Sequence, residues 1–213
     1  MKTRRSTEAG IQPPKPGIKA AKPAKVVATR RRIDRAADRL FSRHGIRAVG
    51  VDALVAKSGV AKMTLYRHYS SKEKLAAAFL ERRGLWMREW LQGEIQRRAE
   101  KPAAQLLAVF DALDEWFRQR DFEGCSLIRL VVELDQRNGP ARRAVVRSLA
   151  SIRALLRDLA EQAGVRNADE FARQWHMLTK GAIVSVCEGD IDAARRAKEL
   201  GELLLARHAV NER

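Results

Sequence analysis

The residues best suited to contact a polyanion gather in the segment 62–68, Lys-Met-Thr-Leu-Tyr-Arg-His. On a helix, Leu65 and Tyr69 lie four residues apart and share one face, which we expect to pack on the core. The other polar side chains then point outward (Lys62, Thr64, Arg67 and His68) or lie at the margin of the exposed surface (Tyr66). A helix of this size fits the major groove of DNA, where such side chains meet base edges and flanking phosphates.

A second helix and a tight turn are needed to position this segment. The apolar pattern over about residues 51–58 predicts a short helix with Leu54 and Val55 facing inward. Gly59 ends this helix because glycine readily takes the left-handed conformation, and Val60 fills the angle between the two helices. Residues 48–69 are therefore predicted to form a helix-turn-helix.

The rest of the chain is also predicted to be helical. Thr29 is expected to cap a first helix that stops at Gly45, a fourth helix begins near Ser71, and Pro102 opens the next one. A loop over 121–126 precedes further helices at about 127–137, 141–163, 168–187 and 191–210. The expected fold is all-α with about nine helices, a three-helix N-terminal bundle followed by a larger C-terminal helical domain.

The net charge of +16 lies mostly in the first third of the chain. Residues 1–28 carry seven Lys and Arg against one Glu, and residues 29–74 carry twelve against four acidic residues, so that +14 of the total precedes residue 75. Such an asymmetry suits a segment that neutralises phosphates, although a basic solubility tail beside an unrelated domain would give the same count. We divide the chain into a disordered Pro/Lys-rich arm (1–28), the helix-turn-helix domain (29–74) and a C-terminal domain (75–213).

The N-terminal bundle resembles the TetR family of bacterial regulators (TetR/AcrR type). The match covers residues 30–75, and the run from Thr64 to Tyr69 followed by Ser71 and Lys72 is its most specific part. These residues fit the family pattern: Phe41, Gly45, Val51, Asp52, Leu54, Gly59, Val60, Thr64, Leu65, Tyr66, His68, Tyr69, Ser71, Lys72 and Leu75. Gly50 departs from it, because the family commonly has a capping Thr or Ser there, and so do Ala61 and Met63.

The resemblance implies a role in DNA binding for six residues. The hydroxyls of Thr64 and Tyr66 would bond phosphate oxygens or base edges, and His68 would donate to either. Three cations would contact phosphates, or guanine where they reach the groove floor: Lys62, Arg67 and Lys72. A solvated charged surface is the alternative reading of Lys62 and Arg67, and Tyr66 and His68 have the alternative reading of ordinary exposed residues.

The resemblance also implies that the larger domain binds an inducer and forms a dimer. Aromatic side chains could line an apolar pocket, or simply pack in the core: Trp86, Trp90, Phe110 and Phe117. Apolar residues of the last two helices would form the interface of a homodimer, or the core of one subunit: Phe171, Trp175, Leu178, Leu200, Leu203 and Leu204. A dimer would place its two recognition helices on half-sites of a palindromic operator.

The expected function is therefore that of a dimeric transcriptional repressor, released from DNA by an unidentified small molecule of apolar or aromatic character. No cofactor, metal or catalytic residue is expected, and the chain is expected to act in the bacterial cytoplasm, associated with the nucleoid when bound to DNA. Cys125 and Cys187 lie outside any metal-ligand spacing, and a redox role for Cys125 competes with a buried, inert thiol. Two other classes remain as alternatives: a helical enzyme with a basic tail, and a DNA-binding protein without sequence preference.

Overall fold

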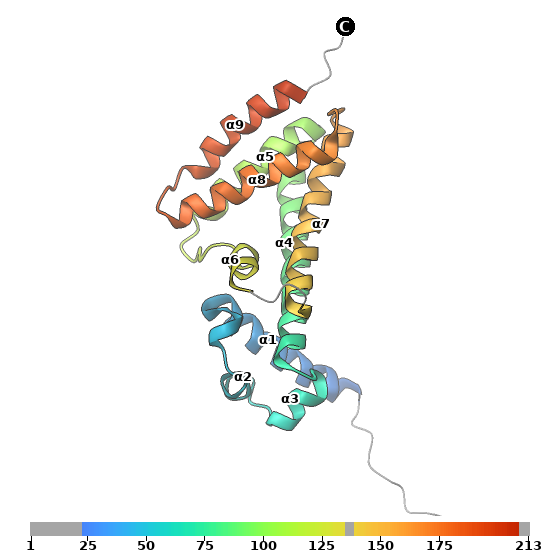
Figure 1. The fold of residues 1–213 in the computed structure, drawn as a ribbon, viewed down its shortest axis with the longest axis vertical. Helices are drawn as coiled ribbons and strands as arrows, with labels where there is room; N and C mark the ends of the chain where they lie inside the picture. The colour runs from blue at the N-terminus through green and yellow to red at the C-terminus, as the bar shows by residue number, and fades with distance from the viewer. Residues whose placement is uncertain (1–22, 135–138, 209–213) are drawn as a thin grey trace, which may run out of the picture.

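The computed structural model describes residues 23–134 and 139–208, and within these ranges the chain forms nine α-helices and no strand (Figure 1). The expected all-α class is therefore confirmed. The helices are α1 (Pro23–Ala48), α2 (Val51–Ser58), α3 (Lys62–His68), α4 (Lys72–Arg98), α5 (Pro102–Phe117), α6 (Ser126–Glu133), α7 (Pro140–Gln162), α8 (Ala168–Cys187) and α9 (Ala193–His208).

The first helix begins earlier than the sequence analysis predicts. It starts at Pro23, so residues 23–28, which we expected in the arm, are helical, and residues 1–22 lie outside the described residues. Thr29 is not a cap: its hydroxyl donates to the carbonyl of Lys25 over 2.9 Å, one turn back inside the helix. Parts of two other predicted helices, residues 135–137 and 209–210, also lie outside the described residues.

Gly45 interrupts α1 close to its end. Its backbone has φ 80° and ψ 169°, a conformation open almost only to glycine, and the chain resumes a short helical stretch up to Ala48. The predicted stop at Gly45 is therefore a kink rather than an end. The kink turns the chain towards α2, which forms the lower end of the molecule together with α3 (Figure 1).

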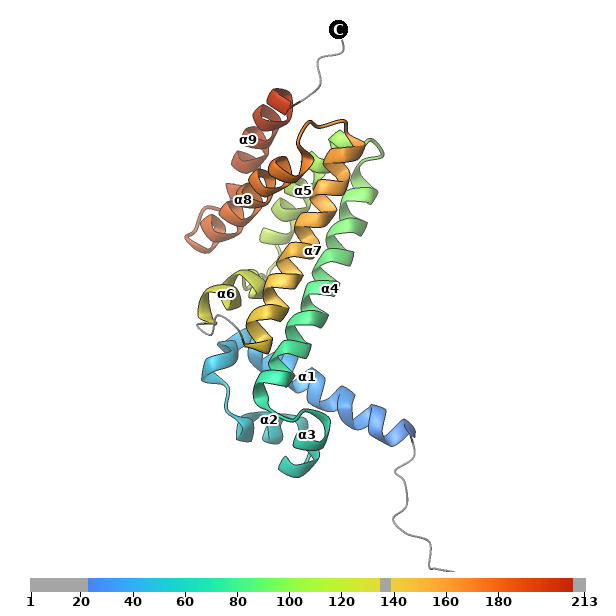
Figure 2. The same ribbon diagram turned by 45° about the vertical axis from the view of Figure 1, so that its right-hand side comes forward.

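Helices α4 and α7 run side by side through the length of the larger domain (Figure 2). They approach closely at Gly84, where a Cβ atom would overlap the side chain of Ser148. The hydroxyl of Ser148 is buried and donates to the carbonyl of Leu80 over 3.1 Å. Because α4 also begins in the N-terminal bundle, it connects the two parts of the molecule as one continuous helix.

Helix α9 packs on α5 and α8 through Gly201. A Cβ atom there would lie 2.8 Å from Phe110 and 3.0 Å from Trp175. Phe171 and Trp175 are fully buried, with their rings stacked at 5.1 Å between centroids. Both are core residues of a single chain, which corrects their prediction as dimer contacts; their aromatic character fits either role in the sequence alone. Within the described ranges, no helix is long and apolar enough to cross a membrane.

Candidate nucleic-acid interface

The turn between α2 and α3 is fixed by glycine conformation and by an arginine from α1. Gly59 has φ 63° and ψ 31°, and its N–H donates to the carbonyl of Val55 over 2.9 Å. Arg32 donates from Nε to the carbonyl of Ser58 (3.1 Å) and from Nη2 to that of Gly59 (2.7 Å). These carbonyls lie at the end of α2 and have no acceptor role inside the helix, so Arg32 satisfies them and fixes the angle at which α3 leaves.

The buried face of α3 is the predicted one. Leu65 is fully buried, and Tyr69, the residue that ends the helix, is 5% exposed. The hydroxyl of Tyr69 donates to Oδ1 of Asp34 over 2.5 Å and accepts from Nε of Arg30 over 3.3 Å. Burial and the bond to Asp34 raise the pKa of Tyr69, so the hydroxyl stays protonated as a donor.

This hydrogen-bond network extends to α4. Arg82 lies 3.2 Å from Oδ1 of Asp34 and donates to Oδ1 of Asp38 over 2.9 Å. The end of α3 is thus connected to both α1 and α4 through buried or half-buried polar groups. Such bonds are directional, so they define the orientation of α3 more narrowly than apolar contacts do.

The opposite face of α3 is open. Tyr66 is 37% exposed, Met63 is 68% exposed, and Lys62 and Arg67 are also exposed. Thr64 and His68 are half-buried on the same short helix. The polar residues predicted to meet DNA therefore lie together on one helix outside the core, although their contacts with DNA remain predictions.

Lys62 is not simply a solvated cation. Its Nζ donates to Oδ1 of Asp52 on α2 over 3.0 Å, and this bond raises the pKa of Lys62. Both side chains are largely exposed. A phosphate near this point would therefore compete with Asp52 for the ammonium group, an exchange that costs little for an exposed ion pair.

The start of α4 lies next to the end of α1. Ser71 caps α4 by accepting from the N–H of Lys74 over 3.1 Å, and Nζ of Lys72 lies 3.4 Å from the carbonyl of Arg47. Helix α2 has no such cap, because Gly50 offers no side chain. The expected loss of the cap at Gly50 is confirmed.

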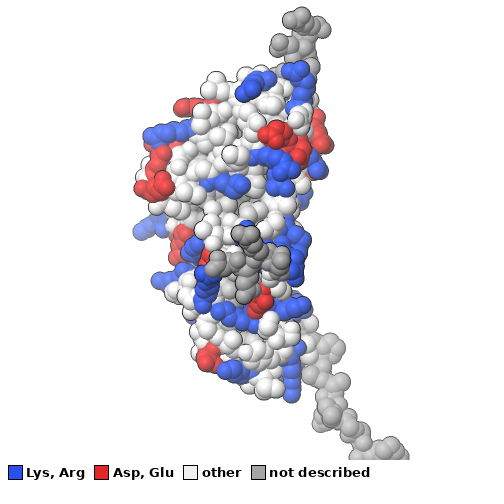
Figure 3. All heavy atoms as spheres, viewed as in Figure 1, with Lys and Arg blue, Asp and Glu red and all other residues white. Residues whose placement is uncertain are grey.

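Lys and Arg side chains surround the lower part of the molecule, over α1–α3 and the start of α4, where few acidic residues appear on the face in view (Figure 3). Towards the upper end, acidic and basic side chains alternate. The positive potential at the helix-turn-helix end would attract a polyanion, and it would do so less at high salt.

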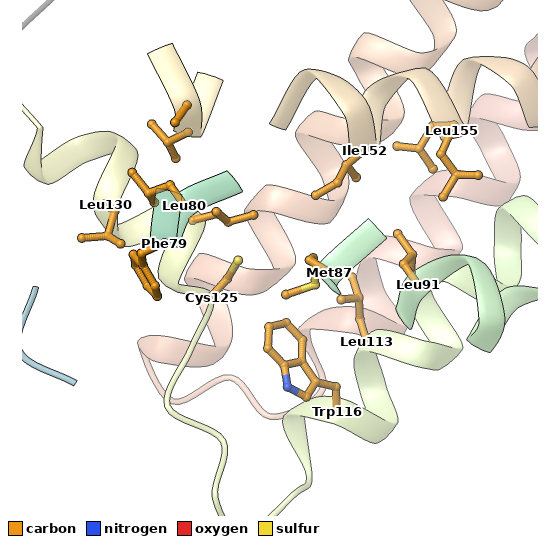
Figure 4. Close-up of a cluster of buried hydrophobic side chains, with 14 of the residues drawn as sticks. Phe79, Leu80, Met87, Leu91, Leu113, Trp116, Cys125, Leu130, Ile152 and Leu155 are labelled. Carbon is orange, nitrogen blue, oxygen red and sulfur yellow. The ribbon is translucent and has the colours of Figure 1, made fainter. Parts of the chain in front are cut away.

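A small internal cavity lies in the larger domain. It has a volume of about 40 Å³, room for a few water molecules and far below the size of a drug-like ligand site. Met87, Leu113 and Trp116 point into the same region beside Cys125 (Figure 4). The full lining is Met87, Trp90, Leu91, Val109, Leu113, Trp116, Cys125, Ile128, Leu149, Ile152, Leu156, His176, Thr179, Lys180 and Ile183.

Of the four aromatic residues predicted for a pocket, Trp90 lines this cavity and three lie elsewhere. Phe110 and Phe117 are buried in the core, Phe110 against Trp175 at 5.2 Å between ring centroids. Trp86 is 44% exposed and stacks on Trp90 from outside. The prediction is corrected for Phe110 and Phe117, because helical spacing identifies an apolar face without distinguishing its packed part from its cavity-lining part, whereas Trp86 lines a separate recess on the surface.

The polar corner of the cavity contains His176. This side chain is 5% exposed, and burial lowers its pKa to about 4, with the nearby cations Lys180 and Arg153 contributing. The imidazole is therefore neutral near pH 7. Cys125 is buried too, and burial raises the pKa of its thiol, which disfavours the reactive thiolate.

Helix α6 connects this cavity to the N-terminal bundle. Ile128 lines the cavity, while Oε1 of Glu133 accepts a hydrogen bond from the N–H of Arg47 over 2.6 Å. Between these positions, Arg129 donates to the carbonyl of Ser42 on α1. One short helix thus contacts both the internal cavity and the end of α1.

Sequence reasoning missed the residues that orient α3, namely Arg32, Asp34 and Arg82. Their partners lie between 26 and 48 positions away along the chain. For Arg32 and Asp34 the only signal in the sequence is the high density of charge in the first helix, which does not show which charges are paired; Arg82 lies in α4.

The sequence matches two family models. Residues 33–79 match the model described as bacterial regulatory proteins, tetR family, and residues 102–200 match the model of the tetracyclin repressor-like C-terminal domain. Together the two models span more than half of the chain. No curated protein matches the chain significantly in sequence.

Solved structures with the same fold cover most of the chain. A TetR-family transcriptional regulator from Streptomyces coelicolor is 26% identical with a TM-score of 0.76, and the alignment covers 86% of this chain and 97% of that one. A TetR-type regulator from Streptomyces avermitilis is also 26% identical, with a TM-score of 0.68 and coverage of 84% and 97%. A TetR transcriptional regulator from Chloroflexus aurantiacus is 22% identical, with a TM-score of 0.73 and coverage of 87% and 98%, and supports the fold alone. The chain belongs to the TetR family of bacterial transcriptional regulators.

Proposed function

We propose that this regulator binds a palindromic operator as a homodimer, represses transcription there, and leaves the DNA when a small molecule binds. The observation that carries this proposal is the geometry of α3. Its core side is fixed by Leu65 and by the bond from Tyr69 to Asp34, and its outer side is polar and open. A short helix held in this way can enter the major groove without unfolding its support.

The DNA contacts follow from the exposed side of α3 and the start of α4. Tyr66 and Thr64 supply hydroxyl groups, His68 supplies an imidazole, and Arg67 supplies a cation at the end of the helix. Lys62 and Lys72 reach phosphates at either side, Lys62 by exchanging Asp52 for a phosphate. Of the N-terminal arm, residues 1–22 carry six Lys and Arg against one Glu, and add affinity for DNA without sequence preference.

The dimer is supported by an apolar surface on the outer sides of α8 and α9. Leu200 and Leu203 on α9 are 53% and 69% exposed, and Met177 and Val184 on α8 are 66% and 45% exposed. Leu178 and Leu204, on the same two helices, are half-buried. Exposed apolar residues on two neighbouring helices are typical of a surface that a partner covers, and a second copy of the chain would do so across a two-fold axis.

The internal cavity and α6 support regulation by a small molecule. A ligand larger than the cavity's present volume of about 40 Å³ must move the helices around it, including α6 at Ile128. Because Arg129 and Glu133 bond α6 to the end of α1, that movement would be transmitted to the N-terminal bundle. The separation of the two recognition helices would change, provided the ligand binds one arrangement more tightly than the other.

The proposal also includes the place and mode of action: the protein binds DNA without catalysing a reaction, in the cytoplasm and on the nucleoid. Selection of bound sequences from random double-stranded DNA tests it. A palindrome with half-sites about one helical turn (~34 Å) or a multiple apart is expected. Enrichment of no sequence, with affinity governed by salt alone, would instead identify a DNA-binding protein without sequence preference and overturn the operator proposal.

A further inference from the structure

A second hollow lies on the surface, between the two domains, and is separate from the internal cavity. It is a recess of about 310 Å³, at the lower end of the range for small-molecule sites. Its lining comes from four places: Ser42 of α1, two residues of α4, Trp116 of α5, and the segment that enters α6. The lining residues are Ser42, Arg83, Trp86, Trp116, Gln119, Asp121, Glu123, Gly124 and Ser126.

Arg83 provides the recess with a positive charge that has no carboxylate partner among the described residues. Its Nε donates to the hydroxyl of Ser126 over 3.2 Å, and its guanidinium lies 4.3 Å from the ring centroid of Trp86. The neighbouring Arg82 differs, because it is paired with both Asp34 and Asp38. The terminal nitrogens of Arg83 therefore keep N–H groups in the fork geometry that matches a carboxylate.

Partial burial makes an anion a favourable occupant. The side chain of Arg83 is half-buried, and burial lowers its pKa. A cation removed from water without a counter-charge is unfavourable, and a bound carboxylate would relieve that cost.

The lining of the recess favours a ligand with a flat, apolar body and a single negative charge. Trp86 is 44% exposed and the buried Trp116 also lines the recess, so aromatic surface is available for contact with an apolar body. Asp121 and Glu123 are exposed residues of the same lining and would repel a doubly charged group such as a phosphate monoester about twice as strongly as a singly charged carboxylate.

We propose that this recess is a binding site for an aromatic monocarboxylate, with the carboxylate on the guanidinium of Arg83 and the ring against Trp86. The occupant would touch Ser42 of the N-terminal bundle and Trp116 of the larger domain at once. Trp116 also lines the internal cavity, so the two hollows share a wall but have different chemistry. Binding at this recess does not depend on the proposed function, whereas any effect on DNA affinity would.

Isothermal titration calorimetry of the full chain without DNA tests the site, with 1-naphthoate as the probe and the neutral 1-naphthamide beside it. The naphthoate is expected to bind, and the amide to bind roughly tenfold more weakly or worse, because it cannot form the charge-assisted bonds. Arg83→Met and Trp86→Ala should each weaken naphthoate binding roughly tenfold, and Arg83→Lys, which keeps the charge but loses the fork, should fall between.

Two control variants test whether naphthoate binds at this recess rather than at another cation of α4 or in the internal cavity. Arg88→Met removes a cation of the same helix that bonds Gln92 and does not line the recess, so naphthoate binding should not change. Leu149→Phe fills the internal cavity and should also leave binding unchanged. The proposal is overturned if Arg83→Met and Arg83→Lys bind like the natural chain, if Leu149→Phe alone abolishes binding, or if no heat is measured up to about 10 mM naphthoate.

Discussion

Glu133 of α6 lies directly against Gly45 of α1, so that a Cβ atom at position 45 would overlap its carboxylate. The same carboxylate accepts the N–H of Arg47, two residues further along the kinked end of α1. This contact joins the larger domain to the DNA-binding bundle at a point where the chain has φ 80°. Both the backbone conformation and the close approach therefore require glycine at position 45.

Replacing Gly45 with alanine tests this contact. Gly45→Ala is expected to lower the free energy of unfolding by about 1–3 kcal/mol, since alanine is strained at this φ and must push Glu133 aside. Urea unfolding measures the change. Gly93→Ala is the control: Gly93 lies inside α4 with no neighbour within 4 Å of a new Cβ, so alanine there should stabilise the chain by up to about 1 kcal/mol. Equal unfolding midpoints for Gly45→Ala and the natural chain would contradict the account.

The ion pair between Lys62 and Asp52 predicts a change in the salt dependence of DNA binding. Asp52→Asn frees Lys62 and removes a negative charge beside α3, so affinity for any DNA should rise severalfold. Lys62→Met should reduce the slope of log affinity against log salt by about one. Glu89→Gln, a change of the same kind at an exposed residue of α4, should alter neither quantity. An unchanged slope in Lys62→Met would show that Lys62 contacts no phosphate.

The lowered pKa of His176 predicts that the free energy of unfolding falls in weak acid. Its pKa is lowered to about 4 in the folded chain, against an ordinary value of 6.5. Between pH 4 and pH 6.5 the unfolded chain therefore binds more protons than the folded chain. The contribution of the neutral imidazole to the free energy of unfolding is full above pH 6.5 and declines as the pH falls towards 4. From pH 7 to pH 5 this one residue should reduce the free energy of unfolding by about 2 kcal/mol.

The measurement compares urea unfolding at pH 7 and pH 5 for the natural chain and for His176→Gln. Other groups titrate in both proteins, so only the difference between them reports His176. A pH dependence of the same size in both proteins would mean that the imidazole is not buried as described.

The exposed leucines of α9 predict the assembly state. Leu200→Glu with Leu203→Glu should give a monomer in sedimentation, because two charges then oppose each other across a two-fold interface. Operator affinity should fall by roughly two orders of magnitude or more as the linked half-site contacts are lost. Val132→Glu, at a valine of α6 that is 82% exposed, is the matched control and should leave the assembly unchanged. A double variant that sediments like the natural chain would exclude this surface as the interface.

Local features of the chain are readable in the sequence, and contacts between distant residues are not. Gly59 and Leu65 act through neighbours a few positions away, so spacing predicted both the turn and the buried face of α3. Arg32 acts on the carbonyls of Ser58 and Gly59 from another helix, and many arginines of α1 could have done so.

The aromatic residues also show that a local sequence pattern does not predict contacts between distant segments. Trp86 and Trp90 lie one turn apart and look equivalent in the sequence, yet Trp90 lines the internal cavity and Trp86 lies outside it. Their difference depends on where α5 and α6 pass α4, which no local pattern specifies. The start of α1 at Pro23 was missed for a related reason: proline suits the first turn of a helix, but its neighbours show no apolar period.

The central claim is that α3 reads the operator through its open side, and footprinting of a Tyr66→Phe, His68→Ala double variant on the selected sequence tests it most directly. Both side chains lie outside the core, so the variant should keep the melting temperature of the natural chain. The account predicts that protection of the palindrome is abolished while salt-dependent binding to random DNA persists. Full protection of the same bases by the folded double variant would contradict it.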